Sequence, residues 1–416
     1  MDILSSLLEG KIKPYQIEDE LKKIRPDFSW SQIVRKATDI RRMYLETKLG
    51  IKLENIGAYT TDLGSKHKKT RIEQTIGCVQ VPVGFAGPIN VKGSYAHGEF
   101  FIPIATNEAA LIAAVNKGAS LLAKCSKNYV SVEIIKDFMT RAPVIKAETL
   151  KDGLELKKWI EENFLGIKAE AEKTTKHGKL EKIDVFLVGK YIYPRFYFST
   201  GDAMGMNMVT IATQSALEYI ESKNKNIKIV SVSGNVCADK KPTAVNALLG
   251  RGKEVHTEIS IDKDIVKSMY NVGLERISEI INVKSYLGSA RAGTITGFNG
   301  HIANIIAGIY LATGQDMAQV VESSTGFVWY EIKDDVIQFG LTLPVLEVGT
   351  VGGGTTTETA RECLEIMDCF GNNKSKKFAE IVAAAVTVGE FNLYGSLAKG
   401  DLAQAHYKFT RSDQNV

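Results

Sequence analysis

The 416 residues of the chain are 44% hydrophobic and 24% charged, which is typical of globular proteins, too apolar for a disordered chain and too long for one compact core. The net charge of +4 comes without the concentrated basic stripe of a nucleic-acid-binding protein, so we expect no nucleic-acid partner. The five cysteines form no C-x-x-C pair and no apolar run approaches the ~18 residues of a membrane span, so we expect a cytoplasmic protein without disulfides, metal site or membrane partner.

The first part of the chain is expected to form a small helical region, followed by the start of a larger domain. Apolar and charged residues alternate at helical spacing in residues 17–24 and 40–45, so we place an N-terminal helical region at 1–70. A basic cluster at 66–71 fits a solvated loop, with contact to a nucleotide phosphate as the alternative. From Ile76 to Ile104, β-like runs punctuated by Gly and Pro begin the main domain, and an Ala-rich helix is predicted at about 107–124.

The middle of the chain predicts a small inserted domain at 144–232. Strand-like residues 142–146, an amphipathic helix at 154–164, strands at 183–188 and 191–198 and a helix at 209–223 follow one another, with a closing strand at 227–232. This order is the split βαβ pattern of a ferredoxin-like unit.

The rest of the chain, 233–416, returns to the main domain, which we place at 71–143 and 233–416. Residues 298–310 are apolar on nearly every helical face, which predicts a central buried helix, and a second long helical region is expected at 378–397. The fold class is therefore α+β: a helical N-terminal region, a large mixed domain around a buried helix, and an inserted ferredoxin-like domain.

Two glycine-rich segments invite comparison with nucleotide-binding loops, but neither has the G-x-G-x-x-G spacing of a Rossmann fold. Residues 348–355 have the wrong glycine spacing and no following Lys, so a tight turn is the more common outcome than a phosphate cradle. Residues 201–208 interleave three methionines with an Asp and an Asn, and their ordinary interpretation is a core turn that starts a helix.

Charged residues in three places could carry chemistry. Lys240 and Lys241 stand between Asp239 and a proline, which would hold one ammonium group on a loop, although a lysine pair is usually solvated surface. Glu108 is expected in the first turn of the Ala-rich helix, where a carboxylate normally complements the helix dipole. Asp316 follows the end of the buried helix, where a carboxylate opposes the dipole and has no structural reason to stand.

Two histidines and an asparagine are weaker candidates. His406 lies near the C-terminal end of the sequence, where an exposed and uninvolved histidine is the usual outcome. His301 and Asn304 lie one turn apart on the predicted buried helix and would share a face. Hydrogen bonding within the core is as common for such a pair as ligand binding.

The order and wording of these motifs resemble the 3-hydroxy-3-methylglutaryl-coenzyme A (HMG-CoA) reductase family from Ile76 onward, in the branch of soluble archaeal-type enzymes. The resembling segments are 76–88, 105–109, 139–144, 201–208, 233–242, 297–301, 312–316, 347–355, 389–393 and 405–406. The resemblance implies NADPH-dependent reduction of the thioester to mevalonate in the isoprenoid pathway, in a homodimer with active sites at the subunit interface. It also implies that the nucleotide site is not a Rossmann fold.

Four catalytic residues are carried over by this resemblance. Two hydrides pass to the thioester carbon, so negative charge develops twice on one oxygen, and a fixed Lys240 ammonium group would stabilise it. Asp316 would keep that ammonium group charged and aimed. His406 would protonate the departing coenzyme A thiolate. Glu108 would supply the proton of the new hydroxyl, which requires a raised pKa; burial against Asp316 would raise it, whereas a helix N-terminus favours the carboxylate.

Binding residues are implied in the same way. The pocket for the hydroxymethylglutaryl group would be formed by Arg141, Ser233, Asn235, Asp239, Lys241, Lys284, His301, Asn304 and Leu393, where fixed cations suit the free carboxylate. The nicotinamide cofactor would contact Thr175, Lys176, Asp202, Met204, Gly205, Met206, Asn207, Gly352 and Gly353. No residue is implied as a metal ligand.

The chain departs from the family pattern at several positions. Thr175-Lys176-His177 stands where Ser-Arg-Phe is common near the adenosine phosphate, which softens the preference for NADPH over NADH. Lys117 replaces a coenzyme-contacting Arg, and Gln74-Thr75-Ile76-Gly77 replaces the usual dimerisation wording. Ser412 stands where animal relatives have a regulatory phosphorylation site, and we expect no such regulation here.

Two other functions compete with this interpretation. One is a coenzyme A protein without redox activity, such as an acyltransferase or a binding module that kept the pocket. The other is the reverse direction, in which mevalonate is oxidised with NAD.

Overall fold

The computed structural model describes residues 3–64 and 72–400, which pack as two compact units. One unit comprises Met1–Pro82 with Thr357–Thr359, and the other comprises Val83–Thr356 with Ala360–Val416. The helices of the first unit are α1 (Ile3–Leu8), α2 (Ile17–Ile24), α3 (Trp30–Leu49) and α4 (Glu54–Gly57).

The first unit is helical, as its periodicity predicts. Ser29 starts α3 with a reciprocal cap, since its hydroxyl accepts from the Gln32 N–H and its own N–H donates to the Gln32 side chain. The helices enclose a small apolar core around Ile17 and Ile33. Beside this core, Arg41 and Glu18 form a buried ion pair.

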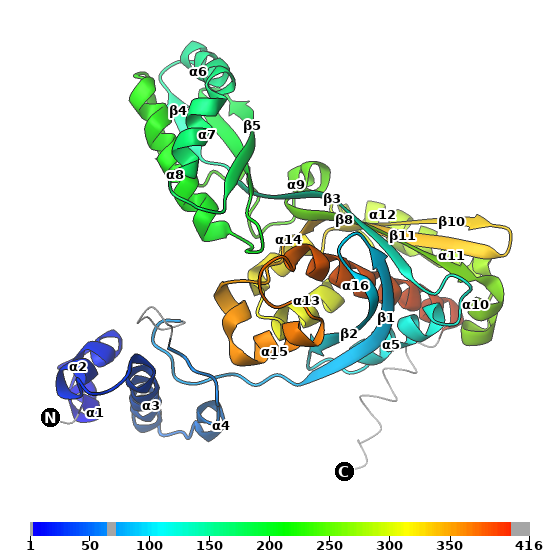
Figure 1. The fold of residues 1–416 in the computed structure, drawn as a ribbon, viewed down its shortest axis with the longest axis horizontal. Helices are drawn as coiled ribbons and strands as arrows, with labels where there is room; N and C mark the ends of the chain where they lie inside the picture. Colours follow the sequence, from blue (N-terminus) through cyan, green and yellow to red (C-terminus); the bar gives the residue numbers. More distant parts are fainter. Residues whose placement is uncertain (1–2, 65–71, 401–416) are drawn as a thin grey trace. The chain divides into compact units, whose positions relative to one another are not determined.

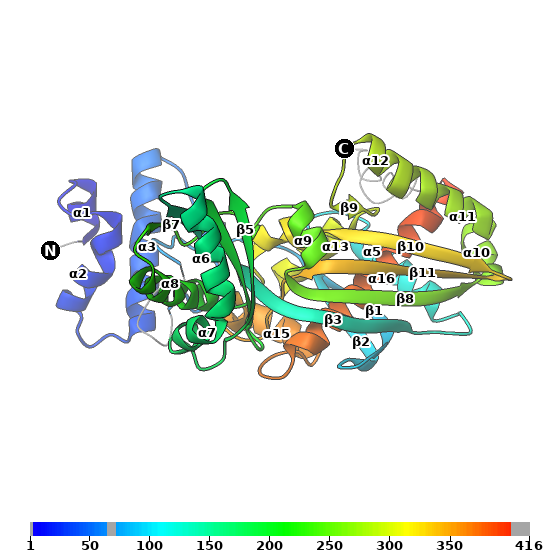
Figure 2. The same cartoon turned by 90° about the horizontal axis from the view of Figure 1, so that it is seen from above.

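The second unit is mixed α/β and is built on one large sheet (Figure 1). The strands of the sheet that belong to the main part of this unit are β1 (Val83–Gly93), β2 (His97–Ala105), β3 (Val130–Arg141), β8 (Gly252–Asp262), β9 (Gly297–Phe298), β10 (Gly326–Lys333) and β11 (Val336–Leu346). Figure 2 shows β3, β8, β11 and β10 side by side, with antiparallel pairing between neighbours. The β1–β3 and β9–β10 pairs are parallel, so the sheet is mixed.

Helices cover this sheet and build its core. They are α5 (Leu111–Leu122), α9 (Ala244–Leu249), α10 (Lys263–Tyr270), α11 (Leu274–Ile281), α12 (Ser289–Arg291), α13 (Ile302–Ala312), α14 (Val320–Ser323), α15 (Glu358–Ile366) and α16 (Ser375–Lys399). The helix predicted at 298–310 is present as α13, which begins at Ile302 and is buried over most of its surface, while Ala303 and Leu311 are exposed. The most enclosed element is α16, which is buried on every face from Phe378 to Gly395.

Among the described residues, α16 is also the one helix long and apolar enough to cross a membrane. Its most apolar window is 83% buried inside the fold. We therefore assign α16 as the core helix on which the sheet packs.

A second hydrophobic core lies around the remaining elements, which we call the β4–β7 region. They are β4 (Val144–Ala147), α6 (Leu150–Glu162), α7 (Phe164–Glu172), β5 (Lys179–Val188), β6 (Tyr191–Ser199), α8 (Met206–Lys223) and β7 (Ile227–Ser231). The strand order is β7-β4-β6-β5, with antiparallel pairs throughout. The helix predicted at 154–164 is present as α6, but the second helix, α7, was not predicted; α7 packs on α8.

Strand β3 joins the two cores. Its residues from Ser131 to Phe138 pair with β8, and its last three, Met139 to Arg141, pair with β6 (Figure 1). The β4–β7 region is thus attached to the large sheet through continuous backbone hydrogen bonds.

The contact between α5 and α16 gives a stability prediction. A methyl group on Gly118 would collide with the main-chain carbonyl of Val388, which belongs to the core helix and cannot retreat. Gly118→Ala gains about 1 kcal/mol of helix propensity but should lose about 1–3 kcal/mol to overpacking. We expect a net fall in the free energy of unfolding measured with urea.

Ser120→Ala is the matched control, because Ser120 is exposed on the same helix and its replacement changes propensity alone. Equal stability of the two variants would contradict the close approach of α5 to α16.

Candidate active site

The loop between β7 and α9 carries the predicted lysine pair and is fixed by hydrogen bonds to its carbonyl groups. Arg195 donates to the Val236 carbonyl at 2.7 Å, and the Thr140 hydroxyl donates to the Cys237 carbonyl at 3.1 Å. The Asn246 amide donates to the Ala238 carbonyl at 3.1 Å. Each of these three donors belongs to a buried residue, so buried side chains fix the path of the loop.

The same loop contains three residues in the left-handed region of backbone conformation. The φ angles are 64° at Asn235, 56° at Ala238 and 58° at Lys240, and none of these residues is a glycine. Left-handed backbone costs roughly 1–3 kcal/mol for each such residue and persists where the surroundings enforce it. Strained residues of this kind often cluster at functional sites, so the loop is a candidate site.

Lys240 is an ordered cation. Its ammonium Nζ lies 2.9 Å from Oδ2 of Asp316, and the two side chains are 42% and 32% exposed. The hydrogen bond from Lys240 to Asp316 is the main cause that raises the pKa of Lys240 above its ordinary value. The surface interpretation fits Lys241 better, because Lys241 is exposed and, within residues 3–64 and 72–400, its ammonium group contacts the Asp239 carbonyl alone, at 3.2 Å.

Asp316 has a structural role that the sequence did not suggest. It does not oppose the dipole of α13, since that helix ends at Ala312. Instead, Asp316 caps the short 3-10 helix η3 (Met317–Gln319), and its carboxylate accepts from the Ala318 N–H at 3.1 Å. The cap orients the carboxylate that faces Lys240.

Glu108 also lies in a different setting from the predicted one. Helix α5 begins at Leu111 after Ala110 in left-handed conformation, so Glu108 belongs to the preceding loop rather than to the first turn. Glu108 is exposed, and its carboxylate accepts from the Asn304 amide at 3.2 Å. The expected burial against Asp316 is not seen, and the expected conflict with the helix dipole does not arise.

His301 and Asn304 begin α13, and His301 is held by a buried carboxylate. Oε1 of Glu390 accepts from the His301 main-chain N–H at 2.6 Å and lies 2.8 Å from the His301 Nδ1. Burial acts to raise the pKa of Glu390, but the His301 hydrogen bond and charge together with nearby N–H donors lower it overall. Leu393, one turn along α16, packs against Gly300.

Glu390 was not predicted as a site residue. A detectable signal was present, since Glu390 is an acidic residue inside the long apolar run of α16, where an unpaired charge would be costly.

The predicted cofactor residues gather where the loop after β6 meets the loop after β11. Gly349 approaches the main chain of Met204 so closely that a side chain there would collide, and the Thr350 N–H donates to the Asp202 carbonyl at 2.8 Å. Gly352 and Gly353 have φ angles of 74° and 53°, and the space beside them is open. The main chain is therefore free to approach a ligand at this point.

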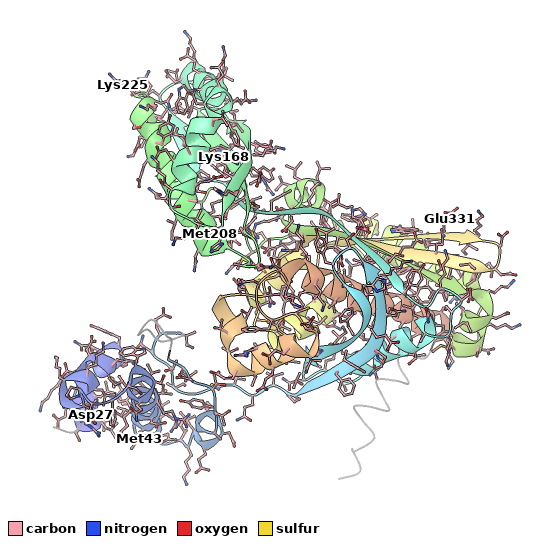
Figure 3. The ribbon with its side chains drawn as sticks, viewed as in Figure 1. Asp27, Met43, Lys168, Met208, Lys225 and Glu331 are labelled. Atoms are coloured by element: carbon pink, nitrogen blue, oxygen red, sulfur yellow. The ribbon has the colours of Figure 1, made fainter. Side chains whose placement is uncertain are left out.

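Residues of α8 join this region. The sulfur of Met206, the first residue of α8, accepts from Arg251 Nη2 at 2.8 Å, and the sulfur of Met208 accepts from the Thr175 hydroxyl at 3.0 Å. Met208 is labelled in Figure 3 near the start of that helix. Thr175 is thus brought beside the 201–208 loop. Lys176 and Asn207 are exposed, and Gly205 precedes α8 in left-handed conformation.

Asp202, predicted to contact the cofactor, forms hydrogen bonds within the protein. Its carboxylate accepts from the N–H groups of Asn373, Lys374 and Ser375 at 2.7, 3.1 and 3.0 Å, at the start of α16. Burial acts to raise the pKa of Asp202, but these N–H donors outweigh it and lower the pKa below its ordinary value. Asp202 therefore ties the predicted cofactor loop to the core helix.

The remaining predicted residues that the structure describes lie on separate elements. Arg141 Nη1 lies 3.7 Å from the Asp239 carboxylate, and Ser233 is half-buried in the loop itself. Lys284 is exposed on the π-helical turn η2 (Asn282–Gly288). His406 lies outside the described residues, as do Ser412 and the basic cluster at 66–71.

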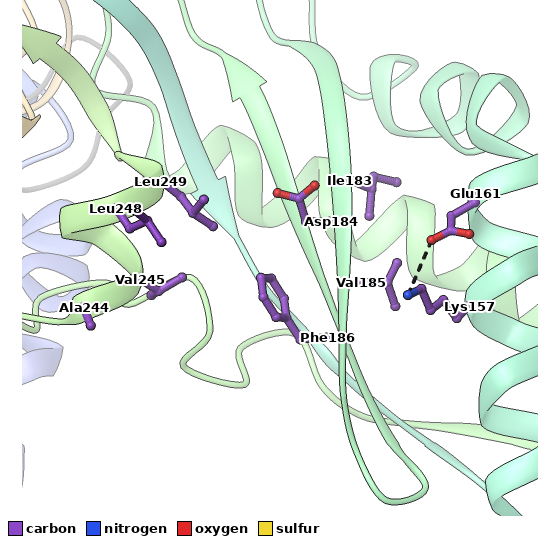
Figure 4. Close-up of a pocket in the computed structure, with 10 residues that line it drawn as sticks. All are labelled: Lys157, Glu161, Ile183, Asp184, Val185, Phe186, Ala244, Val245, Leu248 and Leu249. Atoms are coloured by element: carbon purple, nitrogen blue, oxygen red, sulfur yellow. Dashed lines mark ion pairs between the residues drawn. The ribbon is translucent and has the colours of Figure 1, made fainter.

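Metal ligands and cavities bear on what the site could hold. Within residues 3–64 and 72–400, no group of three or more His, Cys, Asp or Glu side chains is arranged to hold a metal ion. A pocket of about 610 Å³ lies between the β4–β7 region and α9 (Figure 4). Its lining, which includes Phe186 and Leu248, contains none of the predicted site residues.

The contacts of Asp202 predict a pH-dependent contribution to stability. Asp202→Ala should lower the free energy of unfolding by about 1–2 kcal/mol at neutral pH, because three N–H groups at a helix start lose their acceptor. The folded-state pKa of Asp202 is depressed, so this contribution is complete above an unfolded-state pKa of about 3.9 and is lost as the pH falls through the folded-state pKa. Urea unfolding at neutral and acidic pH measures the difference.

Asp264→Ala is the control, since Asp264 is an exposed carboxylate in the first turn of α10. We expect it to cost only a few tenths of a kcal/mol, about what a helix-dipole contact contributes. A difference between wild type and Asp202→Ala that stays constant down to low pH would contradict the assignment.

Comparison with known proteins agrees with the resemblance noted from the motifs. The family described as hydroxymethylglutaryl-coenzyme A reductase matches residues 37–411. A 3-hydroxy-3-methylglutaryl-coenzyme A reductase of Methanocaldococcus jannaschii is 48% identical over 415 residues, which cover 99% of both chains. The corresponding protein of Methanothermobacter thermautotrophicus is 45% identical over 412 residues, covering 99% of this chain and 100% of that one.

The fold is also similar to a solved structure. A class II 3-hydroxy-3-methylglutaryl-CoA reductase from Streptococcus pneumoniae, described as bound to NADPH in open conformations, matches with a TM-score of 0.66 at 16% identity, covering 89% of this chain and 100% of that one. At this identity the likeness concerns the fold. On the family match and the archaeal relatives, the chain belongs to the hydroxymethylglutaryl-coenzyme A reductase family.

Proposed function

We propose that the chain reduces (S)-HMG-CoA to (R)-mevalonate and free coenzyme A by two successive hydride transfers from NADPH, in the mevalonate route to isoprenoids. Membership of the family supports the reaction. The observation that carries the proposal is the ion pair between Asp316 and Lys240, which stands on the strained loop, because reduction of a thioester calls for a fixed cation beside the developing oxyanion.

The first role is stabilisation of negative charge on the substrate oxygen. NADPH, when bound, supplies hydride, and each transfer to a carbonyl carbon leaves charge on the carbonyl oxygen. Lys240 donates to that oxygen, and because its partner Asp316 favours the ionised ammonium form, the cation is present before the reaction starts. Preorganisation spares the site a rearrangement at the moment of charge development.

Two proton donors complete the reaction. His406, as imidazolium, protonates the departing coenzyme A thiolate when the hemithioacetal collapses. Glu108 then donates a proton to the alkoxide that the second hydride transfer leaves on the aldehyde oxygen, which gives the hydroxyl of mevalonate. Its hydrogen bond with Asn304 at 3.2 Å holds the carboxyl group beside the start of α13, near the residues assigned to the substrate.

The substrate carboxylate is assigned to the cationic side of the same loop. Arg141, Lys241 and Lys284 supply positive charge, and Asp239 steers Arg141 through their 3.7 Å approach. Hydrogen-bonding side chains are supplied by Ser233, Asn235, His301 and Asn304. Leu393 supplies an apolar contact. His301 is oriented for this task by Glu390.

The nucleotide site is assigned to the β4–β7 region and the loop after β11. Helices between the strands and the order β7-β4-β6-β5 support a ferredoxin-like unit rather than a Rossmann fold. The open main chain at Gly352 and Gly353 fits a cofactor, since a side chain would fill the space there. Asp202, Met204, Gly205, Met206 and Asn207 line the opposite loop, and Thr175 with Lys176 is assigned to the adenosine phosphate.

The same proposal includes the larger organisation of the protein. We assign a helical region at 1–70, a large domain at 71–143 and 233–416, and an inserted domain at 144–232, which is supported by its separate hydrophobic core. We also propose a cytoplasmic homodimer with active sites at the subunit interface.

The activity is tested by following NADPH absorbance with purified protein and HMG-CoA. Loss of absorbance together with release of coenzyme A is the expected result. Coenzyme A binding without oxidation of NADPH would favour a non-redox binding module instead. A strong preference for NADH, measured as kcat/KM, would favour the NAD-dependent oxidation of mevalonate.

Lys240→Ala should abolish turnover, because the developing oxyanion loses its cation. Removal of one such donor costs at least about 10²–10³ in kcat in well-studied enzymes. The free energy of unfolding should change by no more than about 1 kcal/mol, since a half-exposed ion pair contributes little. Lys225→Ala, an exposed lysine on the β4–β7 region, is the control and should turn over normally.

His406→Gln should block the reduction of HMG-CoA while sparing the reduction of supplied mevaldehyde. The aldehyde step expels no thiolate, so it does not need the proton that His406 provides. Steady-state kinetics with each substrate measures the two steps separately. Equal losses in both assays would rule out thiolate protonation as the role of His406.

A further inference from the structure

One short segment of the chain, Asp316 to Glu322, contacts both the side chain and the main chain of Lys240. Asp316 pairs with the ammonium group, and Oε1 of Glu322 accepts from the Lys240 main-chain N–H at 2.7 Å. We propose that Glu322, together with the buried Arg251, is a positioning residue that holds Lys240 in the left-handed conformation from which its ammonium group reaches Asp316. This inference rests on the catalytic role proposed for Lys240.

The geometry of the segment explains how the two contacts act together. Asp316 caps η3, and Glu322 lies in α14, which follows directly, so both carboxylates project from one continuous helical stretch. The side chain of Glu322 is fully buried, which fixes its position more tightly than that of an exposed residue. A carboxylate that accepts the Lys240 N–H here lowers the cost of the 58° φ angle at that residue.

Arg251 neutralises this buried carboxylate. Its side chain is fully buried, and its guanidinium lies 2.8 Å from Glu322 and 2.9 Å from Asp239, with Glu347 in direct contact. Arg251 therefore holds the residue before Lys240 and the acceptor of the Lys240 N–H with one rigid group. It also contacts Met206, so the same guanidinium touches the loop assigned to the cofactor.

Two buried carboxyl groups face one guanidinium, and only one of them needs to be ionised. Burial raises the pKa of both acids. The pKa of Glu347 lies well above its ordinary value because Glu322 adds to the effect of burial, whereas at Glu322 the Lys240 N–H and Arg251 oppose the effect of burial. A protonated Glu347 can donate to Glu322, and each of the two groups has a second oxygen that is buried without another recorded partner. Glu322 is then the carboxylate that accepts from both Arg251 and Lys240.

A purely structural role is the competing explanation. A buried ion pair is often no more stabilising than apolar residues of similar volume, so stability alone does not account for this arrangement. Glu380 provides the comparison. It is also a buried acid that accepts main-chain N–H groups, from Tyr95 and Ala96, but it has no contact with the Lys240 loop among those recorded.

The test compares Glu322→Gln, Glu322→Leu and Glu380→Leu in the full-length protein. Glu322→Leu removes the acceptor and should lower kcat for HMG-CoA by about 10–100-fold, as expected when a catalytic group is misplaced by about 1 Å, with KM for NADPH nearly unchanged. Glu322→Gln keeps an oxygen in place and should restore most of kcat. Glu380→Leu should lower the unfolding temperature and leave kcat unchanged.

Normal kcat in Glu322→Leu, or an equal loss of kcat in Glu380→Leu, would overturn the proposal.

A second measurement does not depend on activity. Amide hydrogen exchange in the wild-type protein should show the Lys240 N–H protected like core amides, and the lysine pKa measured by NMR of labelled side chains should fall in Glu322→Leu. Rapid exchange at Lys240 would overturn the positioning role even if Glu322→Leu does not fold. If the wild type does not oxidise NADPH but the N–H is protected, the proposed function fails and the positioning geometry stands.

Discussion

The position of one ammonium group, that of Lys240, depends on more of the structure than any other feature of the site. Lysine is a flexible side chain, and here it stands on a loop rather than on a helix or strand. A loop holds a cation in place only if its backbone is fixed by groups that cannot move. Buried donors from β3, β6 and α9 bind three successive carbonyl groups of this loop, and the buried carboxylate of Glu322 accepts from the Lys240 N–H.

This requirement explains why charged residues occur deep in an otherwise apolar molecule. Arg195, Arg251, Glu322, Glu347 and Glu390 are all fully buried, and each contacts either the 233–242 loop, another of these charges or the start of α13. Burying a charge is costly unless partners compensate it. Strand β3 places these groups together, because it pairs with β8 beside Arg251 and with β6 beside Arg195.

The sequence predicted the parts of the structure that local patterns determine. Helical periodicity located α2, α8 and α16, and the alternation of strands and helices gave the order of the β4–β7 region apart from α7. Local reading failed at Glu108, where Thr106 and Asn107 resemble a helix start but the chain turns through Ala110 first. It also could not find Arg251 with Glu322, because residues 71 positions apart are paired only by the fold. The contact of Lys240 with Asp316 was expected from family resemblance alone.

The exposure of the catalytic groups bears on how the site is completed. Lys240 and Asp316 keep 42% and 32% of their side-chain surface accessible, and Glu108 is exposed. Electrostatic stabilisation of an oxyanion is weak in contact with bulk water and grows as water is excluded. The buried network fixes the geometry of Lys240 but leaves its charge screened by solvent. Water must therefore be displaced when substrate binds, and the site proposed on Lys240 reaches its full electrostatic strength only after that step.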